Sequence, residues 1–185
     1  MKLATTTMVT VDGVMQGLGA PDEDRRGGFE RGGWVAPLFE EEAATFLNQV
    51  YERADAFLFG RRTYEIFAGS WGTWDDPGDS PIWTALNTTP KYVASTTPFD
   101  PEWAKTTVLS GDLAAAVREL KAKAGDELQV HGSGVLVRWL STTTSSTRSI
   151  CSSAPSSSAR ARGCSPTPAR TSRSNWWNRG PPQRG

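Results

Sequence analysis

The chain has 185 residues with 20 basic and 20 acidic side chains, so its formal net charge at neutral pH is zero. It contains one histidine and two cysteines, both outside residues 1–140, which excludes clustered imidazole zinc sites and a disulfide or thiolate framework in that part. No run approaches the roughly 18 apolar residues of a membrane span, and residues 1–14 lack the apolar core of a signal peptide. We therefore expect a cytoplasmic protein with one domain, no metal centre and no membrane contact.

The charge is unevenly distributed along the chain. Residues 1–140 hold all 20 acids and 13 of the basic residues, a net charge of −7, whereas residues 141–185 hold seven arginines and no lysine or acid. In that second segment 18 of the 45 residues are Ser or Thr. We predict that residues 1–140 form the functional domain and that residues 141–185 are a disordered basic tail.

Residues 2–11 place apolar side chains on alternating faces and predict a strand that ends at the Asp12-Gly13 turn. A glycine-rich, charged loop follows through Gly33. Residues 37–53 repeat apolar side chains at a spacing near 3.6, with glutamates early, and predict an amphipathic helix. Residues 54–59 form a short apolar run that is typical of a buried parallel strand, and residues 61–67 are predicted to be helical.

Residues 71–81 are predicted to be a loop from their Gly, Pro and Asp content, and residues 82–87 a short helix. Strands are expected at 91–95, 106–109 and 127–131, and Asp112 is a plausible N-cap for a helix through residue 124. Gly132, Ser133 and Gly134 then open a last helix that runs to Leu140. This alternation of strands and helices predicts an α/β fold with a mostly parallel sheet.

Two strand-to-helix junctions, at residues 57–65 and 128–137, carry the residues suited to binding a ligand. A helix N-terminus offers free backbone N–H groups, and glycine lets a phosphate approach them closely. Arg61 and Arg62 add charged donors, and Thr63 adds a hydroxyl. The pattern predicts a phosphorylated ligand across two strand ends, although ordinary glycine turns and a solvated arginine pair would give the same sequence.

The tail has two interpretations: a basic arm that binds nucleic acid, or the product of a shifted reading frame. In the second case each original codon takes the last base of one tail codon and the first two bases of the next. Serine codons then become Val, Leu, Ile or Phe codons, and threonine codons become Asp, Asn, His or Tyr codons. Residues 141–153 then admit L-D-N-D-L-V-D-E-I-N-L-L-V, and residues 154–167 admit G-P-V-V-V-G-x-G-T-R-L-F-P-D. The recovered string predicts a strand followed by a glycine-rich loop, so we favour the frameshift.

Four segments of residues 1–140 together resemble one family: VDG at 11–13, FGRRTYE-x-F at 59–67, KYVAST at 91–96 and VHGSG at 130–134. They are similar to the dihydrofolate-reductase-like family that includes the reductase domain of the bacterial bifunctional riboflavin-biosynthesis deaminase/reductase. The frame-corrected tail resembles the family's next segments. The resemblance implies a three-layer α/β/α dihydrofolate-reductase-like fold whose C-terminal strands are missing or replaced in this chain.

The resemblance also implies hydride transfer from a nicotinamide dinucleotide, usually NADPH with NADH as an alternative, to a pteridine-like or pyrimidine-like small molecule. By motif, Gly60, Arg61, Arg62 and Thr63 would contact cofactor phosphates, Ser95 and Thr96 the adenosine ribose and its 2′-phosphate, and Gly132, Ser133 and Gly134 the pyrophosphate. Asp12 would lie near the nicotinamide or substrate and is the catalytic candidate. Activity is expected to be impaired by the altered tail, and a homodimer is compatible with the resemblance.

Two departures from the family pattern leave alternatives open. Related chains often have an arginine where Thr96 stands, so the preference for NADPH over NADH is open. The acidic proton relay expected on the first helix has no firm counterpart, since Glu41 and Glu42 also serve as helix N-terminal charges. A non-catalytic dinucleotide-binding module and a nucleic-acid binder that uses the arginine-rich tail are the competing functions.

Overall fold

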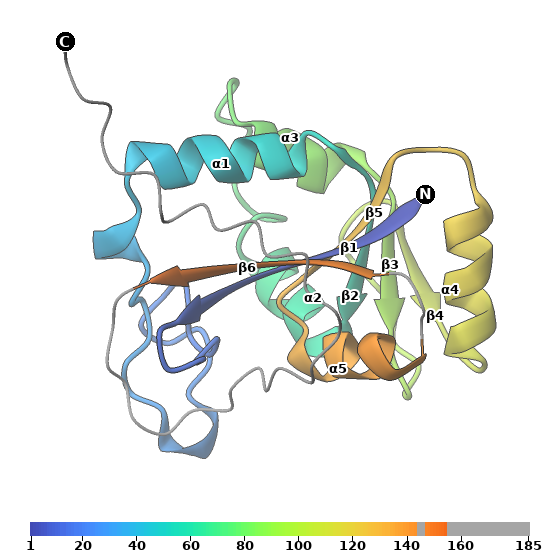
Figure 1. The fold of residues 1–185 in the computed structure, drawn as a ribbon, viewed down its shortest axis with the longest axis horizontal. Helices are drawn as coiled ribbons and strands as arrows, with labels where there is room; N and C mark the ends of the chain where they lie inside the picture. Colours follow the sequence, from blue (N-terminus) through green and yellow to red (C-terminus); the bar gives the residue numbers. More distant parts are fainter. Residues whose placement is uncertain (144–146, 155–185) are drawn as a thin grey trace, which may run out of the picture.

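The structure is a computed structural model that describes residues 1–143 and 147–154, and its core is a six-stranded sheet (Figure 1). The strands are β1 Lys2–Thr10, β2 Ala54–Gly60, β3 Lys91–Ala94, β4 Thr106–Leu109, β5 Glu127–His131 and β6 Thr147–Ala154. Their order across the sheet is β4-β3-β2-β5-β1-β6, and every neighbouring pair is parallel. Because all strands run the same way, their carboxyl ends meet at one edge of the sheet.

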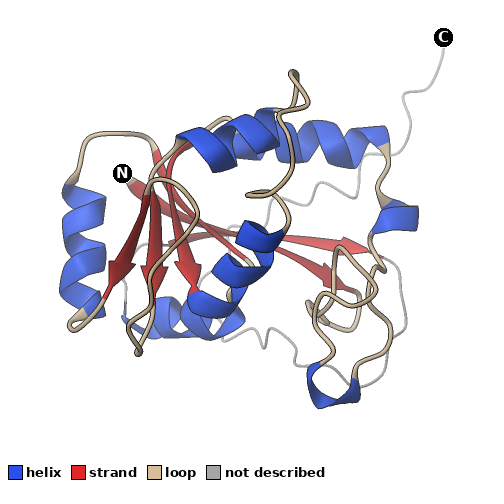
Figure 2. Cartoon of the chain, turned by 180° about the vertical axis from the view of Figure 1, so that it is seen from behind, coloured by secondary structure: helices blue, strands red, loops and turns tan. Residues whose placement is uncertain are grey.

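Helices cover both faces of this sheet, which gives three layers (Figure 2). The α-helices are α1 Glu41–Tyr51, α2 Arg61–Gly69, α3 Pro81–Thr88, α4 Leu113–Ala122 and α5 Gly134–Thr143. Tyr51, Tyr64 and Leu86 from α1, α2 and α3 pack with Phe57 and Phe59 on one face. Residues of α4 and α5 pack with Ala56, Leu58, Leu128 and Val130 on the other face. The three-layer α/β/α architecture with a parallel central sheet expected from the sequence is confirmed.

The strands expected from apolar runs form because their side chains are buried on both faces. Every residue of β5 is buried, and successive residues of β2 enter opposite core clusters. Caps begin two of the helices: the Asp112 carboxylate accepts a hydrogen bond from the Ala115 N–H at 3.0 Å, and Ser80 accepts one from Trp83 at 3.2 Å. The predicted N-cap at Asp112 is therefore confirmed.

The helix expected at residues 37–53 differs from the structure at its start. Residues Ala36–Leu38 form a separate 3₁₀ turn, and α1 begins only at Glu41, after extended backbone at Glu40. Pro37 occupies the first turn of the 3₁₀ segment, where no N–H is needed, and the extended backbone of Glu40 separates this segment from α1. The glutamates at 41 and 42 still occupy the first turn, as the helix dipole favours.

The predicted boundary at Leu140 lies inside a helix, because α5 continues to Thr143. Residues 147–154, expected in the disordered tail, form β6, which pairs in parallel with β1 from Leu3↔Thr147 to Thr10↔Ala154. Strand pairing uses backbone N–H and C=O groups, so it does not require the apolar side chains that the shifted frame would supply. Residues 144–146 and 155–185 lie outside the described residues, and for them the prediction of disorder stays a prediction.

Candidate functional site

The sheet order brings the predicted ligand-binding segments together at one edge. β1, β5, β2 and β3 are consecutive neighbours, so the turns at 10–14, 131–134, 60–63 and 94–97 follow adjacent strand ends. The long loop between β1 and α1 lies at the arrowhead end of β1 (Figure 1). The carboxyl edge of a parallel sheet is where such folds bind nucleotides, so the geometry agrees with the sequence pattern.

The two glycine junctions are hydrogen-bonded to each other. The Gly60 N–H donates to the Ser133 Oγ at 3.0 Å, and the Ser133 N–H donates to the Thr63 Oγ1 at 3.1 Å. Gly132 and Ser133 have φ values of 56° and 51°, a left-handed turn that reverses the chain sharply before α5. Ser133 and Thr63 thus accept hydrogen bonds inside the protein, and the N–H groups left for a ligand are those of the first turns of α2 and α5.

Gly134 lies against the flexible side chain of Met15, which would have to move to admit a side chain at this position. A Cβ added there would lie 2.9 Å from the Sδ of Met15, which reaches it from the loop after β1. The Met15 side chain therefore lies beside the start of α5.

Arg61 points away from the glycine turn of β5 and toward the segment that follows β3. Its guanidinium donates to Glu65 at 2.8 Å and to the Thr97 Oγ1 at 2.9 Å, and it lies 4.4 Å from the centroid of the Phe99 ring. The Ser95 hydroxyl donates to the Thr97 carbonyl at 2.6 Å. The structure thus brings Arg61 to Thr97, the residue that follows Ser95 and Thr96.

Arg62 contacts the loop between β1 and α1, a contact that the sequence did not predict. Its Nη2 lies 3.8 Å from Oδ1 of Asp24, which is only 7% exposed. Arg26 binds the same carboxylate through two nitrogens, and the Gln16 amide donates to it at 3.3 Å. The hydrogen bond from Arg26 lowers the pKa of Asp24 and outweighs burial, which raises it. An acid two residues before an arginine was the only local signal for this cluster.

Asp12 lies in the turn that ends β1, and its side chain is exposed. The Thr10 hydroxyl donates to its Oδ1, and Gly13 has a φ of 83°. The Val14 N–H donates in turn to the Thr10 Oγ1 at 2.9 Å. This is the hydrogen-bonding of an Asp-Gly turn, so the local fold accounts for Asp12 by itself, and its catalytic role stays a prediction.

A buried row of polar side chains on β5 was also not predicted. Arg53 contacts Glu127 at 3.4 Å, Glu127 accepts from Gln129 at 2.8 Å, and the Oε1 of Gln129 lies 2.9 Å from Nε2 of His131. The Tyr51 ring stacks on His131 at a centroid distance of 4.3 Å. Burial lowers the pKa of His131 to about 3, so the imidazole is neutral at physiological pH. The signal in the sequence was the alternation of Glu127, Gln129 and His131 within an apolar strand.

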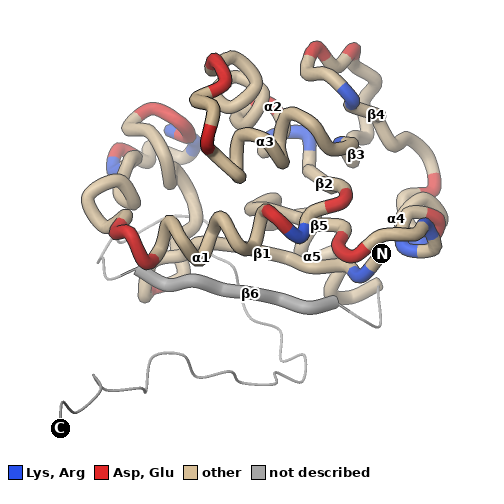
Figure 3. The backbone as a smooth tube through the Cα atoms, turned by 90° about the horizontal axis from the view of Figure 1, so that it is seen from above, with Lys and Arg blue, Asp and Glu red and all other residues tan. Residues whose placement is uncertain are grey.

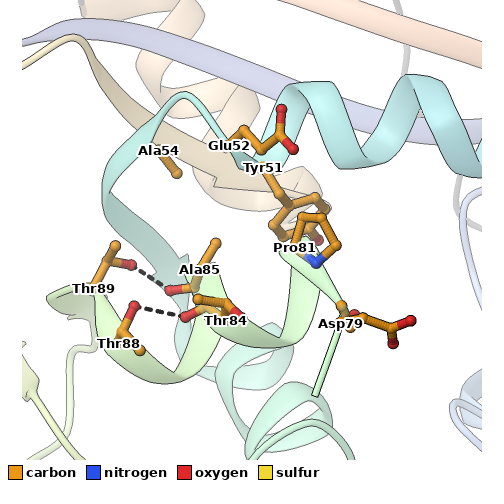
Figure 4. Close-up of a pocket in the computed structure, with 10 residues that line it drawn as sticks. Tyr51, Glu52, Ala54, Asp79, Pro81, Thr84, Ala85, Thr88 and Thr89 are labelled. Carbon is orange, nitrogen blue, oxygen red and sulfur yellow. Dashed lines mark hydrogen bonds between the residues drawn. The ribbon is translucent and has the colours of Figure 1, made fainter. Parts of the chain in front are cut away.

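A groove of about 500 Å³ lies elsewhere, between the end of α1 and α3 (Figure 4). Its lining includes Tyr51, Ala54 and Pro81. The hydroxyls of Thr88 and Thr89 donate to carbonyls of α3 at 2.7 and 2.6 Å, so their protons are not available to a ligand. Because Ala54 begins β2, the groove lies toward the amino end of that strand, away from the glycine junctions.

Three tryptophans, Trp34, Trp71 and Trp74, are divided between two loops. The rings of Trp71 and Trp74 lie 4.9 Å apart, and Trp34 donates to the Gln16 carbonyl at 2.9 Å. No group of three or more potential metal ligands occurs within residues 1–143 and 147–154. In the same part of the chain, no helix has the length and apolarity needed to cross a membrane.

Fold and site together define a parallel α/β protein with paired glycine junctions at the carboxyl edge of its sheet. The model of the RibD C-terminal domain family matches residues 1–155, and the chain belongs to this family. It is accordingly an oxidoreductase of the riboflavin-biosynthesis reductase type. The match extends past the composition change at Leu140 and includes β6. A search of curated proteins gives no match.

Solved structures share the fold at low identity. A protein named for riboflavin biosynthesis from Shewanella sp. PV-4 aligns with a TM-score of 0.53 and 20% identity, over 84% of this chain and 77% of its own. A pyrimidine reductase-like protein from Corynebacterium diphtheriae gives a TM-score of 0.53 and 13% identity, over 85% and 76%. A dihydrofolate reductase from Enterococcus faecalis, complexed with NADP(H), gives 0.47 and 14%, over 76% and 64%.

Proposed function

We propose that the chain is an NADPH-dependent reductase that transfers hydride to a pteridine-like or pyrimidine-like small molecule. The observation that carries the proposal is the convergence of both glycine junctions and Arg61 at the carboxyl edge of the sheet. When bound, the nicotinamide would supply the hydride. The chain would hold the dinucleotide through the first-turn N–H groups of α2 and α5, and Gly134 leaves that backbone uncovered by a side chain of its own.

Arg61 supports NADPH over NADH, although Thr96 has no charge. Its guanidinium already contacts Thr97, the residue after Thr96, and the Phe99 ring supports it from one side. The side chain is 37% exposed, so a phosphate can reach it. Arginine suits a phosphate because its planar donors can bind two oxygens at once. A 2′-phosphate beside Ser95 and Thr96 would therefore find its positive charge on α2 instead of on the loop after β3.

Titration of the purified protein with NADPH and with NADH, followed by fluorescence, tests this assignment. We expect Arg61→Ala to weaken NADPH binding by about 10- to 100-fold, the loss of one charge-assisted contact, and to change NADH binding much less. Arg62→Ala should weaken both cofactors to a similar degree, because it is assigned to phosphates that they share. If a variant that carries both Arg61→Ala and Arg62→Ala binds NADPH as tightly as the unmodified protein, the assignment of these arginines to cofactor phosphates is wrong.

A non-catalytic dinucleotide-binding module is the second candidate. The observation in its favour is that burial keeps His131 neutral, so this residue does not supply a proton to a reduced substrate. Binding of NADPH without oxidation in the presence of any pyrimidine or pteridine acceptor would support the module. Three further expectations stay predictions: nucleic-acid binding by the arginine-rich tail, a homodimer, and a location in the cytoplasm. Nucleic-acid binding would show itself as an affinity that falls steeply with salt concentration.

A further inference from the structure

Two arginines from distant parts of the chain converge on one buried carboxylate, that of Asp24. Arg26 belongs to the loop between β1 and α1, and Arg62 is the second residue of α2. Arg26 donates to the two oxygens of Asp24 through Nε and Nη2, and the Nη2 of Arg62 lies 3.8 Å from Oδ1. The Asp24 side chain is 7% exposed, whereas the side chains of Arg26 and Arg62 are 57% and 50% exposed. The cluster therefore presents two guanidiniums and a net positive charge to solvent.

Most N–H donors of these two guanidiniums have no acceptor in the described part of the protein. Arginine has five such donors, and Arg26 uses those of Nε and one of Nη2 for Asp24, so both donors of Nη1 are not used by this carboxylate. The 3.8 Å contact of Arg62 is an ion pair too long for a hydrogen bond. Both side chains thus keep the paired donors with which arginine binds phosphate oxygens.

The part of the loop that carries Arg26 is held in place by buried hydrogen bonds. The Gln16 amide, which is buried, donates to the carbonyls of Asp24 and Arg26 at 3.0 and 2.8 Å. The Trp34 Nε1 donates to the Gln16 carbonyl at 2.9 Å. An exposed arginine normally loses rotamer freedom when a ligand orders it. Because Asp24 already fixes the Arg26 guanidinium, less of this entropic cost remains to be met on binding.

The same loop lies against both glycine junctions of the candidate site. At its start, Met15 lies beside Gly134 at the beginning of α5. Further along, Asp24 contacts Arg62 in the first turn of α2, which follows Gly60. The two junctions are hydrogen-bonded to each other, so these loop contacts flank one continuous stretch of the carboxyl edge of the sheet.

We propose that the diphosphate of the dinucleotide binds both Arg26 and Arg62, and that Asp24 is the residue that positions the two guanidiniums for it. Arg26 binds through donors that Asp24 does not use, and the phosphate oxygens supply hydrogen-bond acceptors to Arg62. The Asp24 carboxylate is compatible with an anionic ligand because Arg26 and Gln16 already donate to its oxygens. The inference rests on the proposed function, because a dinucleotide at the glycine junctions is the source of the diphosphate.

Arg26→Ala and Arg25→Ala are the matched pair that tests the contact. Both remove one positive charge from neighbouring exposed positions of the loop, but Arg26 is the residue that binds Asp24. Titration with NADPH and with NADH, followed by fluorescence, should give affinities about tenfold lower for Arg26→Ala and nearly unchanged for Arg25→Ala. Both cofactors should lose affinity equally, because they share the diphosphate. Arg26→Gln keeps a donor for Asp24 without the charge and should lose affinity as well.

Asp24→Asn tests positioning when it is made both with and without Arg26. In the protein that has Arg26, the substitution should lower NADPH affinity about three- to tenfold, the cost of ordering a side chain that is no longer held. In the Arg26→Ala background it should lower affinity less than about twofold, because the main residue that Asp24 positions is absent. A merely structural role of Asp24 would weaken binding by the same factor in both backgrounds.

Four results would overturn the inference: equal effects of Asp24→Asn in the two backgrounds, tighter NADPH binding in Asp24→Asn, unchanged affinity in either Arg26 variant, or an equal loss in Arg25→Ala. Arg62→Ala separates this failure from failure of the proposed function. If Arg62→Ala weakens both cofactors and Arg26→Ala weakens neither, the cofactor assignment survives and the role of Arg26 and Asp24 does not. If the unmodified protein binds neither cofactor, both fail.

Discussion

At the scale of single residues, Ser133 shows how one side chain joins two parts of the site. Its Oγ accepts from the Gly60 N–H while its own N–H donates to Thr63, so the junctions after β2 and β5 share a fixed geometry. The residue also holds a φ of 51°, which is costly for any residue except glycine. Serine supplies the hydroxyl that accepts from Gly60, whereas glycine would adopt this φ without strain but would lack that hydroxyl.

Ser133→Ala and Ser133→Gly separate these two contributions. The alanine variant leaves the Gly60 N–H without its acceptor and keeps the left-handed strain, so it should lower the free energy of unfolding by about 1–3 kcal/mol. Glycine loses the same acceptor but relieves the strain, so it should be more stable than alanine by about 1 kcal/mol. Urea unfolding measures both. An alanine variant as stable as the unmodified protein would contradict the assigned hydrogen bond.

His131 predicts a dependence of stability on pH. Burial lowers its pKa in the folded protein to about 3, whereas the unfolded chain takes up the proton near the ordinary value of 6.5. The unfolded state therefore binds more protons between these values, and the free energy of unfolding falls as the pH falls. The slope is at most about 1.4 kcal/mol per pH unit.

Urea unfolding between pH 7 and 5 isolates this effect, because carboxylates titrate mainly below that range. Loss of stability over the interval should reach about 2 kcal/mol in the unmodified protein. His131→Gln keeps the hydrogen bond to Gln129 but has no titratable group, so its stability should be nearly constant there. Equal slopes in the two proteins would show that another group is responsible.

At the scale of elements, the strands and most helices could be predicted because local patterns decide them. Residues 54–60 are a strand because nearly all of their side chains are buried, and α4 starts where Asp112 caps it. The loop between β1 and α1 could not be predicted in the same way. Its conformation depends on Asp24, Gln16 and Arg62, which come together only in the folded chain. The row on β5 was missed for the same reason, because its partners Arg53 and Tyr51 lie on and after α1.

Asp24→Asn tests whether this loop depends on its buried carboxylate. The substitution removes the charge that Arg26 and Arg62 share, and charge-assisted hydrogen bonds contribute about 1.5–3 kcal/mol. We expect trypsin to cleave the loop faster at Arg25 and Arg31. Glu30→Gln is the matched control, since Glu30 is an exposed acid in the same loop. Equal cleavage rates in the two variants would contradict the role of Asp24.

At the scale of the whole molecule, the net charge of residues 1–140 has the same sign as the charge of the proposed cofactor. Residues 1–140 carry a net charge of −7, which disfavours an anionic dinucleotide at long range. Figure 3 shows a basic stretch where β2 passes into α2, and acidic segments on several of the loops. Cofactor affinity must therefore come from local contacts at this junction, which is why Arg61 and Arg62 are the residues to vary.

The last prediction concerns β6, the edge strand next to β1. In the frame-corrected reading, positions 149, 151, 152 and 153 become apolar, where this chain has Ser149, Cys151, Ser152 and Ser153. Each apolar side chain that becomes buried contributes about 1.5–3 kcal/mol, within a total stability of about 5–15 kcal/mol for a typical domain.

A gene with one nucleotide restored near the Leu140 codon should therefore encode a protein that unfolds about 10 °C higher or more. NADPH-dependent reduction should rise with it, because β1, whose carboxyl end lies at the candidate site, would pair with a better-packed strand. Both proteins are to be expressed side by side and compared by thermal unfolding and cofactor oxidation. Equal stability and equal activity would show that residues 141–185 are the native end of this domain and would remove the frameshift interpretation.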